Sequence, residues 1–119
     1  MQSEQQLDRK KFASDWEAGW NSHDLDRILS HYSEDVVFRS RKAVELVGSG
    51  EIKGKAALRE YWGRALEKQP DLKFTVQNSF LGHDIIVITY LNHKNVQAAE
   101  TLRFDARGLV VEASASHAV

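Results

Sequence analysis

The chain has no cysteine in its 119 residues, which excludes disulfide bonds, thiolate nucleophiles and zinc sites with sulfur ligands. It also lacks any run of about 18 apolar residues, the length that a membrane-spanning helix needs. Residues 1–6 are too polar for the apolar core of a signal peptide. We therefore expect a cytoplasmic protein with no membrane partner.

Neither sign of charge is in excess. The chain has 16 Lys and Arg against 17 Asp and Glu, and its longest run of like charge is Arg9, Lys10 and Lys11. Nucleic acid binding needs a basic face that displaces counterions from phosphates, so we expect no nucleic acid partner. The hydrophobic content of 42% is typical of globular proteins, and the length fits one domain over residues 1–119.

Sequence motifs for bound cofactors are missing as well. The five histidines show neither H-x-H nor H-E-x-x-H spacing, and three of them fall in predicted turns. No glycine-rich nucleotide loop and no G-x-S-x-G pattern occurs. The sequence therefore predicts neither a metal site nor a cofactor.

Three helices are predicted in the first part of the chain. Phe12, Trp16 and Trp20 recur at every fourth position and form one stripe on a helix over residues 5–21. After a polar break at residues 21–24, apolar positions 25, 28, 29 and 32 predict a short second helix. A third helix begins at Gly54 and ends before Pro70, which cannot continue it.

Strands follow the helices. Residues 36–38 predict a strand, and a weaker one is expected over residues 44–47. From Leu72 onward Leu72, Phe74, Val76 and Phe80 alternate with polar residues, which is typical of a strand with one buried face. Turn sequences separate three more strands at 85–91, 96–104 and 109–117. Helices followed by a four-stranded meander predict an α+β fold.

Four short motifs carry a resemblance to a known family. They are Trp-Asn-Ser-His-Asp-Leu at 20–25, Tyr-Ser-Glu-Asp-Val-Val-Phe at 32–38, Ile-Lys-Gly-Lys at 52–55 ahead of 58–62, and residues 103–105 with 108–110. With them the sequence resembles the nuclear transport factor 2-like superfamily, in its SnoaL-like (polyketide-cyclase-like) branch. The resemblance implies a cone-shaped half-barrel, in which three helices pack on a curved, mostly antiparallel sheet that encloses a pocket. This fold carries isomerases, cyclases, dehydratases and non-catalytic binding modules.

The resemblance also implies positions for a site. Ketosteroid isomerase, a relative in this superfamily, uses an Asp base with a Tyr and a protonated Asp as oxyanion donors. Matching along the shared motifs places the base position at Ser40, the tyrosine position at Trp16 and the second carboxyl position at Glu100. Because serine cannot accept a proton at neutral pH without its own base, the familiar steroid-isomerase route is not expected.

Strand alternation points independently to Glu100. It shares parity with Ala98, Leu102 and Phe104, which places a carboxyl group among inward-facing apolar residues and should raise its pKa. The alternatives are a local bulge that reverses the parity, or an ion pair on the outer face.

His117 is the expected partner of Glu100. It shares parity with residues 109, 111, 113 and 115, and the alanines at 113 and 115 leave space in front of it. The two side chains could form a hydrogen-bonded acid/base pair. The alternative is a frayed, solvated histidine near the chain end.

Aromatic residues complete the predicted site. We expect Trp16, Trp20, Phe38, Tyr61 and Trp62 to line a pocket for an apolar ligand, although each could instead be ordinary core. Tyr90 and Asn92 share a strand face with Ile86 and Ile88 and add polar contacts.

Two functions fit these residues. One is cofactor-free acid/base catalysis on a small hydrophobic molecule (isomerisation, cyclisation, dehydration or hydration), in which Glu100 and His117 move protons while Ser40 and Trp16 orient the substrate. The other is a non-catalytic ligand-binding or dimerisation module. A homodimer through the outer sheet face is also expected, with Lys73, Thr75, Val87, Thr89 and Val110 at the contact.

Overall fold

A computed structural model describes residues 4–119. The first part of this range holds α1 (Glu4–Ser22), α2 (Leu25–Leu29), β1 (Tyr32–Arg39), α3 (Ala43–Val47), β2 (Glu51–Lys53) and α4 (Lys55–Lys68). The second part is the predicted meander, with β3 (Thr75–Leu81), β4 (Ile85–Leu91), β5 (Gln97–Phe104) and β6 (Val110–His117). The predicted α+β class is confirmed.

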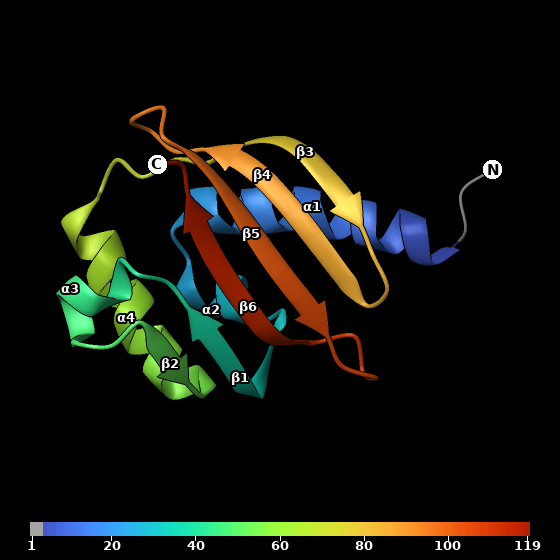
Figure 1. The fold of residues 1–119 in the computed structure, drawn as a ribbon, viewed down its shortest axis with the longest axis horizontal. Coiled ribbons are helices and arrows are strands. Elements are labelled where there is room, and N and C mark those ends of the chain that lie inside the picture. Colours follow the sequence, from blue (N-terminus) through green and yellow to red (C-terminus); the bar gives the residue numbers. More distant parts are fainter. Residues whose placement is uncertain (1–3) are drawn as a thin grey trace.

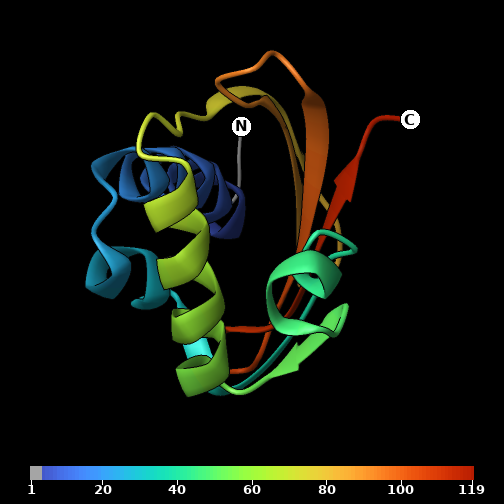
Figure 2. The ribbon, with the colours of Figure 1, turned by 90° about the vertical axis from the view of Figure 1, so that its left-hand side faces the viewer.

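All six described strands form one sheet, in the order β2-β1-β6-β5-β4-β3. Neighbouring strands are antiparallel except β1 and β6, which run parallel. In Figure 1 the long helix α1 crosses behind the strands. Figure 2 shows the sheet nearly edge-on, curving around the helices α1, α2 and α4. The helices therefore cover the concave face of a half-open cone.

Local sequence explains how the helices begin and pack. The predicted stripe on α1 is buried, with Phe12, Trp16 and Trp20 at most 9% exposed. Asp24 caps α2, because its carboxylate accepts hydrogen bonds from the backbone N–H groups of Asp26 and Arg27. Gly54 precedes α4 with φ +92°, a conformation that favours glycine. These features fix the helices against the concave face of the sheet.

Two secondary-structure predictions are wrong. Residues 44–47 belong to the helix α3 instead of a strand, so the described residues hold four helices and not three. The edge of β1 is already paired by β2, where Ile52 is buried, whereas Val44 on α3 is 52% exposed. Tyr32 does not lie on α2, which ends before it. Tyr32 begins β1, is paired with Val110 and is 2% exposed.

Two bulges reverse the predicted alternation. The register of β3 shifts between Val76 and Asn78, so Phe80 is 58% exposed although it shares parity with buried Leu72. The pairing of β5 with β6 also shifts by one residue. Arg103 is paired with Glu112 and Phe104 with Val110, so Val111 is the extra residue. Val110 is therefore fully buried, against the prediction that it faces outward. Residues 109 and 111, which were predicted to face inward, are only half-buried.

Candidate functional site

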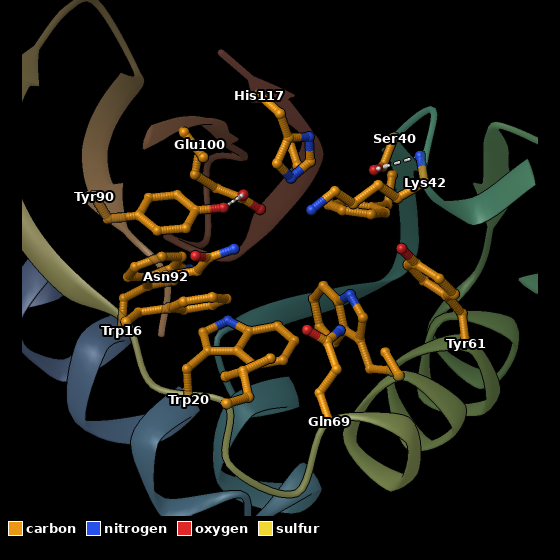
Figure 3. A pocket seen from close by; sticks show the side chains of 17 residues that line it. Trp16, Trp20, Ser40, Lys42, Tyr61, Gln69, Tyr90, Asn92, Glu100 and His117 are labelled. Atoms are coloured by element: carbon orange, nitrogen blue, oxygen red, sulfur yellow. Dashed lines mark hydrogen bonds between the residues drawn. The ribbon is translucent and has the colours of Figure 1, made fainter. Parts of the chain in front are cut away.

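A cavity of about 90 Å³ opens between the helices α1 and α4 and the concave face of the sheet. Nine of the residues singled out in the sequence line it (Figure 3): Trp16, Trp20, Phe38, Ser40, Tyr61, Trp62, Tyr90, Glu100 and His117. The rest of the lining comes from Lys42, Ala65, Gln69, Leu72, Phe74, Asn92, Ala98 and Ala115. The fold thus brings together residues that lie up to about 100 positions apart in the sequence.

Aromatic rings form one wall of the cavity. The rings of Trp20 and Trp62 meet edge to face with centroids 4.8 Å apart, and Trp16 stacks on Phe74 at 5.4 Å. Phe38 also contacts Trp62 edge to face, at 5.4 Å. Such offset and edge-to-face pairs stabilise the wall beyond their area burial. These residues are therefore core and cavity lining at once, so the two interpretations of the aromatic stripe do not exclude each other.

Polar side chains of α1 anchor part of this wall. The amide of Asn21 both donates to the carbonyl of Phe74 (2.9 Å) and accepts from its N–H (2.8 Å). Two residues after Phe74, the N–H of Val76 donates a hydrogen bond to the carboxylate of Glu17 on α1. The ring of His23 lies 2.7 Å from the carbonyl oxygen of Leu72, so its Nε2 must carry the proton. The 20–25 motif therefore holds the segment that leads into β3 against the end of α1.

Glu100 lies inside the cavity, on β5. The pairing of β4 with β5 runs without interruption from Ile85 to Leu91, so no bulge disturbs the inward parity of Glu100. Its side chain is 3% exposed, and its Oε1 accepts a hydrogen bond of 3.3 Å from the Tyr90 hydroxyl. Burial raises its pKa to about 8, against a smaller lowering by this hydrogen bond. Glu100 is therefore mostly a neutral carboxylic acid at neutral pH.

Three tyrosines lie near this carboxyl group. Burial raises the pKa of Tyr32, Tyr61 and Tyr90, and the negative charge that Glu100 can carry raises each of them further. All three phenols are consequently neutral hydrogen-bond donors over the physiological range. Tyr32 lies behind the cavity lining, whereas Tyr61 and Tyr90 belong to it.

His117 enters from β6, where it is paired with Ala98. Burial lowers its pKa, and the positive charges of Lys42 and Arg41 lower it further, so the imidazole is neutral at neutral pH. The predicted hydrogen bond to Glu100 is absent: Tyr90 holds Glu100, and the buried Nδ1 of His117 has no partner among the described residues. The histidine is nevertheless part of the strand, with a half-buried side chain.

Ser40 and Lys42 lie across the cavity from Glu100 and Tyr90 (Figure 3). Ser40 is 6% exposed, and its Oγ accepts a hydrogen bond from the Lys42 N–H (3.3 Å). The side chain of Lys42 extends toward Glu100 and His117 (Figure 3). Sequence reasoning missed Lys42. This residue immediately precedes α3, and the segment that forms α3 was predicted to be a strand. Its position two residues after Ser40 was the available signal.

Several buried polar atoms in this region have no hydrogen-bond partner within the described part of the chain. They include the indole nitrogen of Trp20 and Nδ1 of His117, both of which line the cavity. Buried polar groups are nearly always satisfied, and an indole N–H can only donate. A bound molecule with acceptor atoms would satisfy the groups that face the cavity.

Other kinds of site find no support among residues 4–119. No group of three or more His, Cys, Asp or Glu residues there could hold a metal ion. None of the helices described is both long and apolar enough to cross a membrane.

Comparison with known proteins gives a family and a fold. The profile of the SnoaL-like domain matches residues 13–113. A SnoaL-like protein of unknown function from Burkholderia thailandensis is 37% identical with a TM-score of 0.87, over 92% of this chain and 94% of that chain. No curated protein matches.

Two further solved structures share the fold at lower identity. AclR from Streptomyces galilaeus, a candidate hydroxylase, is 23% identical with a TM-score of 0.74, over 94% of this chain and 90% of that one. A candidate isomerase of the SnoaL-like family from Agrobacterium tumefaciens is 11% identical with a TM-score of 0.73, over 92% and 96%. At these identities the likeness shows the fold alone.

Proposed function

The chain belongs to the SnoaL-like domain family of the nuclear transport factor 2-like superfamily, and from its pocket we propose that it binds a small, largely apolar organic molecule and transfers protons on it without a cofactor. The relatives described as hydroxylase and isomerase candidates support a catalytic or binding role for this fold. The observation that carries the proposal is the Glu100 carboxyl group, buried and neutral, in a cavity lined by aromatic rings.

Glu100 is suited to act as the acid. Its Oε1 accepts the hydrogen bond from Tyr90, so the proton of the neutral carboxyl group resides on Oε2. Figure 3 shows this second oxygen pointing into the cavity. A carboxylic acid with a pKa of about 8 can donate a hydrogen bond or a proton to a substrate oxygen near neutral pH. The apolar wall strengthens such an interaction by excluding water.

His117 is suited to act as the base. Its imidazole is neutral, and its unpartnered Nδ1 can accept a proton in the tautomer that carries hydrogen on Nε2. The small side chains of Ala98 and Ala115 lie beside it and leave room for a substrate. In the proposed reaction His117 takes a proton from the carbon next to a carbonyl group, while Glu100 donates to the carbonyl oxygen. In a β,γ-unsaturated ketone, His117 returns the proton to the γ carbon while the enol proton goes back to Glu100, which gives the conjugated isomer. In a β-hydroxy ketone, the hydroxyl takes the proton from His117 and leaves as water while the enol proton goes back to Glu100, which completes a dehydration.

Exchange of hydrogen for deuterium tests this chemistry without knowledge of the substrate. Small cyclic ketones are incubated with the protein in D₂O, and loss of the proton signals next to the carbonyl is followed by NMR. Wild type is expected to accelerate the exchange, Glu100→Gln and His117→Gln to abolish the acceleration, and the control Glu67→Gln, which changes an exposed carboxyl on α4, to leave it intact. Acceleration that survives in Glu100→Gln contradicts the assigned role.

The second candidate function is a non-catalytic ligand-binding module. It is favoured by a specific observation: Glu100 is the single carboxyl group in the lining, and it is not hydrogen-bonded to His117. Under this proposal ketones or related molecules bind in the cavity, as seen from shifts of the indole N–H signals of Trp16 and Trp20, but no exchange is accelerated. Binding and exchange are measured on the same samples, which separates the two functions.

We also propose a homodimer through the outer sheet face, in the cytoplasm. Val87 and Thr89 alternate with the buried residues of β4 and therefore lie on that face, as does exposed Thr75 on β3, which is paired with Leu91. Val110 is not part of this surface, because it is fully buried. Light scattering after size-exclusion chromatography should give twice the chain mass of 13.5 kDa. A mass of 13.5 kDa at high concentration contradicts the dimer.

A further inference from the structure

Resting on the proposed function, we infer that the ligand is a carboxylate, whose apolar ring lies against the aromatic wall and whose anionic group is bound by the ammonium of Lys42. This goes beyond a small apolar molecule, because it assigns the ligand a charge and gives Lys42 a role in specificity.

Lys42 is placed to meet a ligand in the cavity. It precedes α3, and the hydrogen bond from its N–H to Ser40 holds its backbone at the rim. Its side chain lines the cavity and points toward Glu100 and His117 (Figure 3). Other cations, such as Arg39 and Arg59, pair with carboxylates within 4 Å. For Lys42 no such ion pair occurs with the described residues.

The remaining lining has nothing that offsets this charge at neutral pH. Its other titratable groups are Glu100, His117, Tyr61 and Tyr90. Glu100 and both tyrosines are neutral because of their raised pKa, and His117 is neutral because its pKa is lowered. The cavity therefore carries one positive charge. A bound anion would neutralise it, whereas a bound cation would be repelled.

Hydrogen-bonding capacity points the same way. The indole of Trp20 is 5% exposed, lacks a partner for its N–H, and carries its nitrogen on the edge that faces the cavity in Figure 3. Neutral Glu100 offers another donor, and Lys42 offers three. Each of these donors needs an acceptor, which oxygen atoms of a ligand can supply. A carboxylate supplies two oxygens that accept and none that donates.

Size and polarity restrict the rest of the ligand. The cavity of about 90 Å³ is of the order that holds one small ring. Trp20, Trp62 and Phe74 line the cavity with aromatic rings against which such a ring can pack. A ring in this position leaves its carboxylate near the rim, where Lys42 lies. An aromatic carboxylate with a short linker, such as trans-cinnamate, has this form.

Glu100 makes the affinity for a carboxylate depend on pH. The charged and titratable groups near Glu100 are Tyr90 from β4, His117 from β6, Tyr61 from α4, Tyr32 from β1 and Lys42. When Glu100 ionises near pH 8, its carboxylate repels an anionic ligand and competes for Lys42. Carboxylate affinity is therefore expected to fall between about pH 7 and pH 9. This fall should be absent in Glu100→Gln.

The test compares trans-cinnamate with its neutral isostere trans-cinnamamide. Both are titrated into ¹⁵N-labelled protein near pH 7, and dissociation constants are taken from the indole N–H signals of the three tryptophans. Wild type is expected to bind cinnamate about tenfold more tightly than cinnamamide, the size of one charge-assisted hydrogen bond. Lys42→Met keeps the aliphatic stem and should abolish the preference. Lys53→Met, which removes an exposed ammonium on β2, should retain it.

The outcomes separate the inference from the function on which it rests. Equal binding of both probes, or a preference that survives in Lys42→Met, overturns the role of Lys42 and leaves the pocket as a binding site for neutral molecules. Failure of both probes to shift any indole signal overturns the inference and the proposed pocket function together. Loss of the preference in Lys42→Met alone, with the control unchanged, supports the inference.

Discussion

Replacing Glu100 with Gln should change how the stability of the protein depends on pH. Gln has nearly the same shape and can still accept the hydrogen bond from Tyr90, but it cannot ionise. In wild type the pKa of Glu100 is about 8 when folded and has its ordinary value of 4.5 when unfolded. Between these values the folded protein holds one more proton than the unfolded chain, so stability falls as pH rises.

The magnitude follows from the two pKa values. At about 1.4 kcal/mol for each pKa unit, the rise from 4.5 to about 8 corresponds to a loss of about 5 kcal/mol. This contribution is fully present below pH 4.5 and is lost once the pH exceeds about 8. Through the interval, the free energy of unfolding of wild type should fall relative to Glu100→Gln by about 1.4 kcal/mol per pH unit. Such a change is large against a typical stability of about 5 to 15 kcal/mol.

Urea denaturation measures this difference. Unfolding is followed by fluorescence of the three tryptophans at several pH values between about 5 and 9, for wild type, Glu100→Gln and the exposed control Glu67→Gln. Other ionisable groups are common to all three proteins and cancel in the comparison. A difference between wild type and Glu100→Gln that stays constant with pH refutes the buried neutral carboxyl group.

Three other substitutions test how the site is held. Asn21→Ala removes both hydrogen bonds to the backbone of Phe74. It should lower the free energy of unfolding by about 1 to 3 kcal/mol and weaken ligand binding. An unchanged midpoint in urea denaturation contradicts the anchoring role. Tyr90→Phe removes the hydrogen bond that lowers the pKa of Glu100. The pH at which the stabilities with Glu and with Gln at position 100 diverge should therefore move upward. A downward shift would be inconsistent with this contact. Leu58 is fully buried under α4, so Leu58→Ala leaves a cavity there. The substitution should destabilise the protein by about 2 to 5 kcal/mol. A loss below about 1 kcal/mol in thermal unfolding would show that α4 relaxes into the space.

Alternation and helical periodicity carried the prediction of the fold where one pattern ran unbroken. The stripe of Phe12, Trp16 and Trp20 gave α1 almost to the residue, and the inward position of Glu100 followed because β4 and β5 pair without a bulge. Both patterns arise from geometry that is local to one element. They remain valid as long as nothing interrupts the element.

Local patterns failed where tertiary pairing decided the structure. The bulges in β3 and β6 insert one residue each, and no residue type at Gln77 or Val111 announces them. Segment 43–47 became a helix because residues 51–53 occupy the edge of β1. Lys42 was missed for the same reason, since its place at the cavity depends on where α3 begins.

The prediction of a Glu100 and His117 pair shows a second limit. Parity placed both side chains at the same cavity, which the structure supports. The two lie on neighbouring strands in diagonal positions, because Glu100 is paired with Ala115 and His117 with Ala98. Tyr90 lies on β4, at the other side of β5, and its hydroxyl donates the hydrogen bond to Glu100 instead. Which neighbour makes the hydrogen bond depends on side-chain reach, which parity does not contain.

The protonation state of Glu100 is the most direct test of the proposed chemistry. In ¹³C-labelled protein the carboxyl carbon of Glu100, assigned by its absence in Glu100→Gln, is followed by NMR as the pH is raised. A midpoint of about 8 is predicted from its burial, which leaves the acid protonated and able to donate at neutral pH. A midpoint near the ordinary value of 4.5 would mean an ionised carboxylate, and would contradict both the proposed acid and the positively charged cavity.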